Sequence, residues 1–208
     1  MADELVLYTN PRSRGRIARW MLEEVGQPYR TEILDFATTM KAPAYLAINP
    51  MGKVPALRHG DAVVTETAAI CAYLADAFPR TGLAPPPGDR LRAPITVGCS
   101  SPPGRWRRRP AAEAMGFAVP PEREGMMATV QLRSSDEGAS KRRCRVAITR
   151  SAGRLRRRMS TSARTSGFGL MFGTLEKRPA FQQYWQRLGA RPAYARAREL
   201  DEALQAKP

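Results

Sequence analysis

Two places in the first ninety residues join a hydroxyl or carboxylate side chain to the start of a predicted helix. Ser13 stands where apolar residues begin to recur at helical spacing, and Thr9 and Asn10 lie just before it. Glu66 and Thr67 stand before a second apolar run. A hydroxyl donor and the unpaired backbone N–H groups of a first helical turn both stabilise an anion. Either place could therefore hold a negatively charged group, and the alternative for both is ordinary helix capping.

The elements around these residues are predicted from hydropathy period and from Gly and Pro positions. Short apolar runs bounded by turn residues indicate strands, and apolar residues three and four apart indicate helices. The expected order is strand, helix, strand, then a helical or irregular stretch, then a hairpin and a final helix. The expected ranges are 5–8, 12–25, 31–34, 41–48, 54–58 with 62–64, and 68–74. This order is that of a thioredoxin-like α/β domain over residues 1–80, followed by a Pro- and Gly-rich linker over 81–94.

Three segments of this domain resemble the glutathione transferase family, especially its bacterial members. They are residues 8–14 (YTNPRSR), 49–57 (NPMGKVPAL) and 65–70 (TETAAI). One such motif alone would be weak evidence, whereas three in the family's order are specific. The resemblance implies that glutathione is a co-substrate, that no metal or other cofactor is needed, and that the partner is an electrophilic small molecule.

The resemblance also implies roles for the residues of the first helix. Little of a cysteine thiol with a pKa near 8.5 is ionised at neutral pH, so the family must stabilise the thiolate of glutathione. The family's activating residue is a Ser, Tyr or Cys near this point, and Ser13 matches it best. Thr9 and Asn10 are close substitutes, and the alternative for Ser13 remains helix capping.

Binding roles follow in the same way for the two other motifs. Pro55 resembles the family's cis-proline, beside which the backbone of Val54 would pair with glutathione like an added strand. Lys53 would meet the glycyl carboxylate, or would be an ordinary exposed lysine. Glu66 and Thr67 would bind the γ-glutamyl end, or would form a simple capping box.

Residues 95–208 are expected to form the family's all-α C-terminal domain, but 95–166 are atypical and basic. The net charge of the chain is +15, and residues 95–166 hold 16 Lys or Arg against 5 Asp or Glu. Residues 179–197 resemble late helices of the family. Because the segment before them lacks the apolar period of packing helices, we expect these late helices to find no core.

An out-of-frame origin is our hypothesis for much of the basic segment. Residues 96–109 and 159–167 can be back-translated into codons that, read in a frame shifted by one base, give family-like sequence. The nucleotide sequence of an independent clone would test this. The rivals are a disordered segment and a genuine basic insertion that binds nucleic acid. A specific binder should interleave aromatics with its basic residues, and between residues 95 and 166 Trp106 alone is so placed.

The predicted function is thus a glutathione transferase, and the alternative is a non-catalytic glutathione-binding or nucleic-acid-binding protein. A cytoplasmic homodimer is expected, with no specific nucleic acid and no membrane partner. Trp20 and Cys71 fall on apolar helix faces and are predicted to be buried. His59 is predicted to be a turn residue.

Overall fold

The computed structural model describes residues 3–92, 116 and 179–205. The chain divides into two compact units, one made of residues 1–92 with 187–208 and the other of 93–186. Most of the described residues belong to the first unit. Helix α8 (Pro179–Gly189) crosses the boundary between the units. The basic segment, and with it the frameshift hypothesis, lies outside the described residues apart from Gly116.

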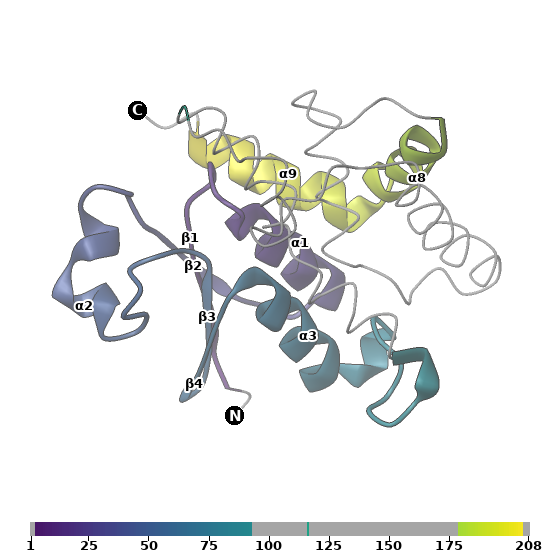
Figure 1. Cartoon of the computed structure of the whole chain (residues 1–208), viewed down its shortest axis with the longest axis horizontal. Coiled ribbons are helices and arrows are strands. Elements are labelled where there is room, and N and C mark those ends of the chain that lie inside the picture. The colour runs from purple at the N-terminus through teal and green to yellow at the C-terminus, as the bar shows by residue number, and fades with distance from the viewer. Residues whose placement is uncertain (1–2, 93–115, 117–178, 206–208) are drawn as a thin grey trace. The chain divides into compact units, whose positions relative to one another are not determined.

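A four-stranded mixed sheet forms the centre of the first unit (Figure 1). Its strands are β1 (Leu5–Thr9), β2 (Arg30–Ile33), β3 (Ala56–His59) and β4 (Ala62–Thr65), in the order β2-β1-β3-β4. Strand β1 runs parallel to β2 and antiparallel to β3, and β4 is antiparallel to β3. This topology confirms the thioredoxin-like α/β domain predicted from the sequence.

Helices α1 (Gly15–Val25) and α3 (Thr67–Ala77) pack against each other on one face of this sheet (Figure 1). The buried side of α1 includes Trp20, which is 1% exposed, and that of α3 includes Cys71 at 5%. Both were predicted to be buried, and both predictions are confirmed. Gly26 ends α1 in the left-handed region with φ 71°, a conformation that glycine adopts without steric cost.

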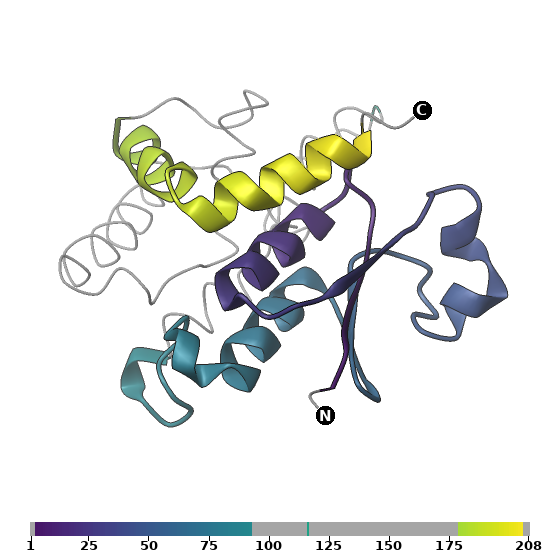
Figure 2. The same ribbon diagram turned by 180° about the vertical axis from the view of Figure 1, so that it is seen from behind.

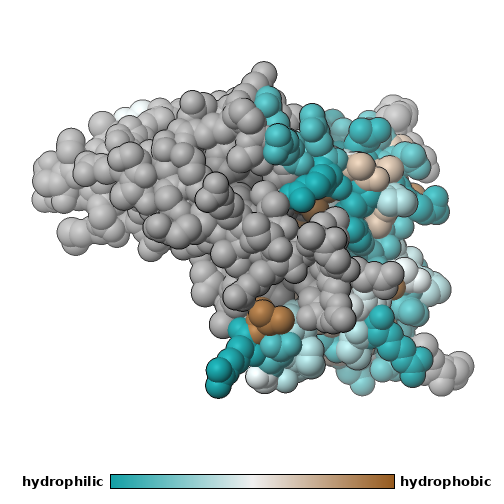
Figure 3. Space-filling view, turned by 90° about the vertical axis from the view of Figure 1, so that its right-hand side faces the viewer, coloured by the Kyte–Doolittle hydropathy of each residue, from teal (hydrophilic) through white to brown (hydrophobic). Residues whose placement is uncertain are grey.

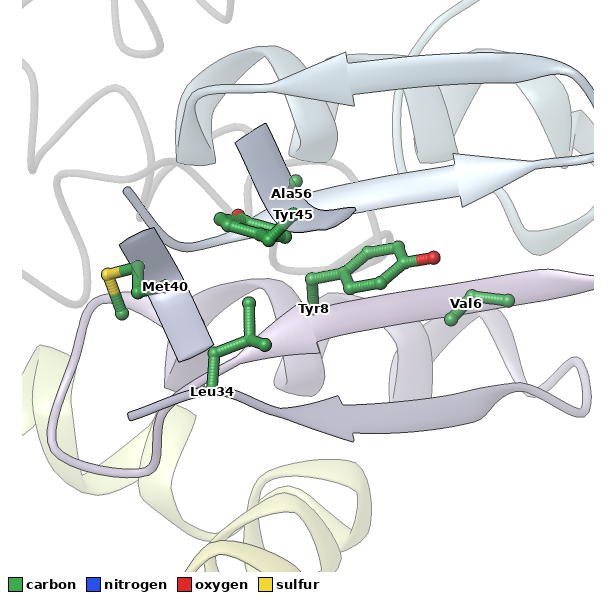
Figure 4. Close-up of a cluster of buried hydrophobic side chains, with 6 residues drawn as sticks. All are labelled: Val6, Tyr8, Leu34, Met40, Tyr45 and Ala56. Carbon is green, nitrogen blue, oxygen red and sulfur yellow. The ribbon is translucent and has the colours of Figure 1, made fainter. Parts of the chain in front are cut away.

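The other face of the sheet is covered by the short helix α2 (Pro43–Leu46) and the 3₁₀ turn Thr39–Lys41. Side chains from β1, β3 and these two elements form an apolar cluster beneath them, which Figure 4 shows. Its members are Val6, Tyr8, Leu34, Met40, Tyr45 and Ala56. Because sequential Cβ atoms on a strand alternate between faces, Val6 and Tyr8 face this cluster while Leu7 faces the α1 side. Further 3₁₀ turns follow α3 at Pro79–Thr81 and Arg90–Arg92.

Two predicted boundaries and one predicted residue role differ from the structure. Helix α1 begins at Gly15 rather than at residue 12, because residues 10–13 form a separate hydrogen-bonded turn. Strand β3 begins at Ala56, after the cis bond between Val54 and Pro55. His59 is not a turn residue: it is the last residue of β3, and its Nδ1 lies 2.8 Å from the hydroxyl of Tyr73 on α3.

The last helix, α9 (Pro192–Gln205), lies along α1 on the side away from the sheet (Figure 2). Its Ala197 and Asp201 are both 1% exposed, and the ring of Tyr194 meets that of Trp20 at a centroid distance of 4.9 Å. The expectation that the late helices find no core is therefore wrong for α9. The reason is that α1 offers a second buried face, which the sequence pattern of the intervening segment does not reveal.

One face of the described residues is largely polar. In the view of Figure 3 most of the coloured residues are hydrophilic. Within the described ranges, every helix is too short or too polar to cross a membrane.

Candidate functional site

Strand register brings the three sequence motifs to one end of the sheet. Tyr8 of β1 pairs with Ala56 of β3, and Ala56 pairs in turn with Thr65 of β4. The segments that adjoin these three residues are the loop after β1, the turn before β3 and the N-terminus of α3. The first motif is thus a neighbour of the other two in space, although Tyr8 and Ala56 are 48 positions apart in the sequence.

The loop after β1 is held by its own side chains. The amide of Asn10 donates to the carbonyl of Leu34 at 2.8 Å, and its Oδ1 accepts from the backbone N–H of Arg12 at 2.9 Å. The hydroxyl of Ser13 donates to the carbonyl of Asn10 at 2.7 Å and accepts from the N–H of Gly15 at 2.9 Å. Ser13 therefore stabilises the turn that leads into α1, whose N-cap is Arg14 rather than Ser13.

The three candidate activating residues differ in accessibility. Thr9 is completely buried, and Asn10 is 9% exposed with both ends of its amide engaged in the turn. Ser13 is only partly buried. The hydroxyl of Thr9 also lies against α1, since a Cβ built at Gly15 would stand 1.8 Å from it. Of the three residues, Ser13 is thus the most exposed.

The turn before β3 contains the cis bond between Val54 and Pro55, as the family motif implied. The carbonyl of Lys53, just before it, accepts from the hydroxyl of Tyr45 at 2.7 Å and from the amide of Asn49 at 2.6 Å. Burial raises the pKa of Tyr45, which keeps its phenol protonated as a donor. The side chain of Lys53 is exposed, and Val54 is half-buried.

The N-terminus of α3 combines two unusual features. Glu66 is the N-cap residue and has φ 66°, a left-handed conformation that costs a non-glycine residue about 1–3 kcal/mol and tends to occur at functional sites. Its side chain makes no capping hydrogen bond. Thr67 follows at 5% exposure, and its Oγ1 finds no hydrogen-bond partner within the described part of the chain. The simple capping box is therefore not formed.

Several supporting residues were missed at the sequence level. Tyr45 and Asn49 hold the Lys53 carbonyl, and Gly15 allows Thr9 to approach α1. Asn49 opens the motif 49–57 and could have been identified there, whereas Tyr45 and Gly15 carry no local signal. Across residues 3–92 and 179–205, no three His, Cys, Asp or Glu side chains are grouped as a metal site would need.

Comparison with known proteins agrees with this arrangement. Residues 13–77 match the family model of the glutathione S-transferase N-terminal domain. A glutathione S-transferase of Xanthomonas campestris is 39% identical over 89 residues, which are 43% of each chain. A maleylacetoacetate isomerase of Rhizobium meliloti is 43% identical over 98 residues, 44% of this chain and 45% of the relative. The matched residues thus span less than half the length of these curated relatives.

A solved structure extends the similarity along the chain. The theta class glutathione S-transferase of Xanthomonas axonopodis pathovar citri, with glutathione bound, superposes with a TM-score of 0.65 at 26% identity. The superposition covers 94% of this chain and 97% of that one, which is consistent with a thioredoxin-like domain followed by a helical one. Residues 13–77 of this chain thus form a domain of the glutathione S-transferase N-terminal type.

Proposed function

We propose that the chain binds glutathione at the end of the sheet where the three motifs meet. The observation that carries the proposal is the N-terminus of α3, where a strained Glu66 precedes a buried hydroxyl of Thr67 that lacks a partner in the described residues. Burying a hydroxyl that has no hydrogen-bond partner costs free energy. A ligand carboxylate bound at the helix N-terminus would accept a hydrogen bond from that hydroxyl. In this proposal Thr67 donates to the γ-glutamyl carboxylate, and Glu66 accepts from the ammonium group.

The rest of the tripeptide would extend toward the turn before β3. The backbone of Val54, next to Pro55, precedes the first paired residue of β3 and is proposed to pair with the central residue of glutathione. The exposed side chain of Lys53 would meet the glycyl carboxylate as a solvent-screened ion pair, which contributes little to affinity.

The proposed reaction is attack by the thiolate of glutathione on an electrophilic carbon. A sulfur–carbon bond forms, and either a leaving group departs with its bonding electrons or the adduct takes up a proton. Ser13 would donate its hydroxyl hydrogen to the thiolate. Because that hydrogen is now donated to the carbonyl of Asn10, the hydroxyl must rotate and give up a hydrogen bond worth about 0.5–1.5 kcal/mol.

The electrophile is proposed only as a class. One relative is named a maleylacetoacetate isomerase, so both conjugation and glutathione-dependent isomerisation belong among the reactions to be assayed. In keeping with the family, we further propose a homodimer in the cytoplasm.

The deciding experiment is calorimetric titration of the full chain with glutathione. Thr67→Ala removes the proposed donor and should weaken binding roughly 10- to 150-fold, the equivalent of about 1.5–3 kcal/mol for a hydrogen bond to a charged group. Thr67→Ser keeps the hydroxyl and should bind as the parent does. Thr38→Ala removes an exposed hydroxyl elsewhere and serves as the matched control. Equal affinity of Thr67→Ala and the parent would remove Thr67 from the site.

A further inference from the structure

Helix α9 runs antiparallel along the whole length of α1. At one end, the guanidinium of Arg191 forms an ion pair with Glu24 near the C-terminus of α1. At the other end, the side chain of Gln205 reaches Pro11, just before α1 begins. Figures 1 and 2 show the two helices side by side from opposite directions. The C-terminal end of α9 is therefore adjacent to the loop that carries Ser13.

The contacts at this end fall on both sides of Ser13. The Nε2 of Gln205 donates to the carbonyl of Pro11 at 3.0 Å, two residues before Ser13. The carboxylate of Asp201 lies 3.5 Å from the Nε of Arg16, three residues after Ser13, and 2.7 Å from the Nε of Arg19. These contacts link α9 to the loop and to the first turns of α1.

The loop's own hydrogen bonds determine its shape, and within the described residues α9 adds a hydrogen bond at Pro11. Asn10 and Ser13 bond to atoms within residues 10–15 and to Leu34, and Arg14, the N-cap of α1, makes no side-chain capping bond. The carbonyl of Pro11 is the point at which a residue from the C-terminal end of the chain holds this loop. Its orientation fixes the peptide plane from which Arg12 and Ser13 continue.

We propose that the end of α9 is a positioning element for the hydroxyl of Ser13, with Gln205 as the positioning residue. The inference rests on the proposed function, in which Ser13 must turn from the carbonyl of Asn10 toward the thiolate. A loop held at Pro11 limits the orientations that the Ser13 side chain can adopt. Fewer orientations that point away from the thiolate then compete with the one that donates to it. Loss of the link raises the pKa of the bound thiol without changing the residues that bind glutathione.

The test compares the parent chain with Gln205→Met, which keeps the side-chain length but removes the donor. Gln205→Lys retains an N–H donor and is the rescue variant. Gln27→Met, at an exposed glutamine beyond the other end of α1, is the matched control. Equal urea midpoints for all four chains establish that the fold is intact. If Gln205→Met unfolds earlier, Gln205→Ala at lower temperature replaces it in the comparison.

Two readouts are taken. Hydrogen exchange of the backbone amides of residues 12–17, measured without ligand, should be roughly 2- to 12-fold faster in Gln205→Met, as expected for one lost hydrogen bond. The pKa of glutathione bound to the protein, followed by the ultraviolet absorbance of its thiolate, should rise in Gln205→Met while glutathione affinity stays that of the parent. Gln205→Lys and Gln27→Met should match the parent in both.

Each outcome decides between the alternatives. Faster exchange with a raised thiol pKa supports the proposal. Unchanged exchange, or faster exchange with an unchanged thiol pKa, overturns it. A parent chain that binds no glutathione rejects the proposed function instead, and with it the role given to Ser13; the exchange data would then still show whether Gln205 holds the loop.

Discussion

The buried ion pair between Arg19 and Asp201 connects the first and last helices, and we expect Asp201→Asn to destabilise the chain strongly. The two side chains are 2% and 1% exposed, and their nearest atoms are 2.7 Å apart. The amide of asparagine has nearly the same shape as the carboxylate but cannot balance the charge of the guanidinium. Breaking a buried pair in this way costs about 3–5 kcal/mol, a large part of the 5–15 kcal/mol that typically stabilises a domain.

Urea unfolding followed by circular dichroism measures this loss. With a typical slope of about 1–3 kcal/mol per molar urea, the midpoint of Asp201→Asn should fall by roughly 1–5 M. Glu202→Gln is the control, because Glu202 is 55% exposed and its pair with Arg198 is worth at most about 0.5 kcal/mol. Replacing both members, as in Arg19→Met with Asp201→Leu, should recover most of the stability, since two apolar side chains leave no buried charge.

This reasoning would be refuted if Asp201→Asn lowered the free energy of unfolding by less than about 1 kcal/mol, which is what a solvent-exposed ion pair contributes. The guanidinium would then be hydrated, and α9 would not exclude water from α1. A double variant as unstable as Asp201→Asn would refute it in another way. It would show that packing volume rather than charge balance determines the stability of this contact.

Three further predictions concern the site and its surroundings. Ser13→Ala should raise the apparent pKa in the pH–rate profile and lower turnover with little change in glutathione affinity; an unaltered profile would leave Ser13 as a turn residue only. Gly15→Ala should destabilise the chain by about 1–3 kcal/mol, because the added Cβ would overlap the hydroxyl of Thr9. Gly189→Ala is the control, since the space around Gly189 is open. Equal urea midpoints for the two variants would contradict the close packing at Gly15. Burial, reinforced by a hydrogen bond to the carboxylate of Glu23, raises the pKa of Tyr29. The stability that the protonated phenol contributes is therefore complete below the pKa of the unfolded chain, near about 10, and is lost as the pH rises toward the pKa of the folded chain. The parent should therefore lose more stability than Tyr29→Phe between about pH 9 and 11, and parallel stability–pH curves would show that Tyr29 is solvated.

The sequence by itself determined the order of strands and helices in the first domain. Apolar residues at a period of 3.6 identified α1, and the Gly-containing turn at residue 60 identified the hairpin. Such patterns are local, because the spacing of apolar residues within one helix or hairpin is enough to identify its buried face. The motifs also indicated which residues to examine for glutathione binding.

Tertiary structure decided which of those residues are accessible and what holds them. Thr9 and Ser13 carry the same functional group four residues apart, yet Thr9 is completely buried against Gly15 and Ser13 is only partly buried. Arg19 and Asp201 are separated by 182 residues, and neither the period nor the motifs indicate that they pair. Burial and long-range contacts depend on how complete elements pack together, and this information is distributed over the whole chain rather than held in any one segment.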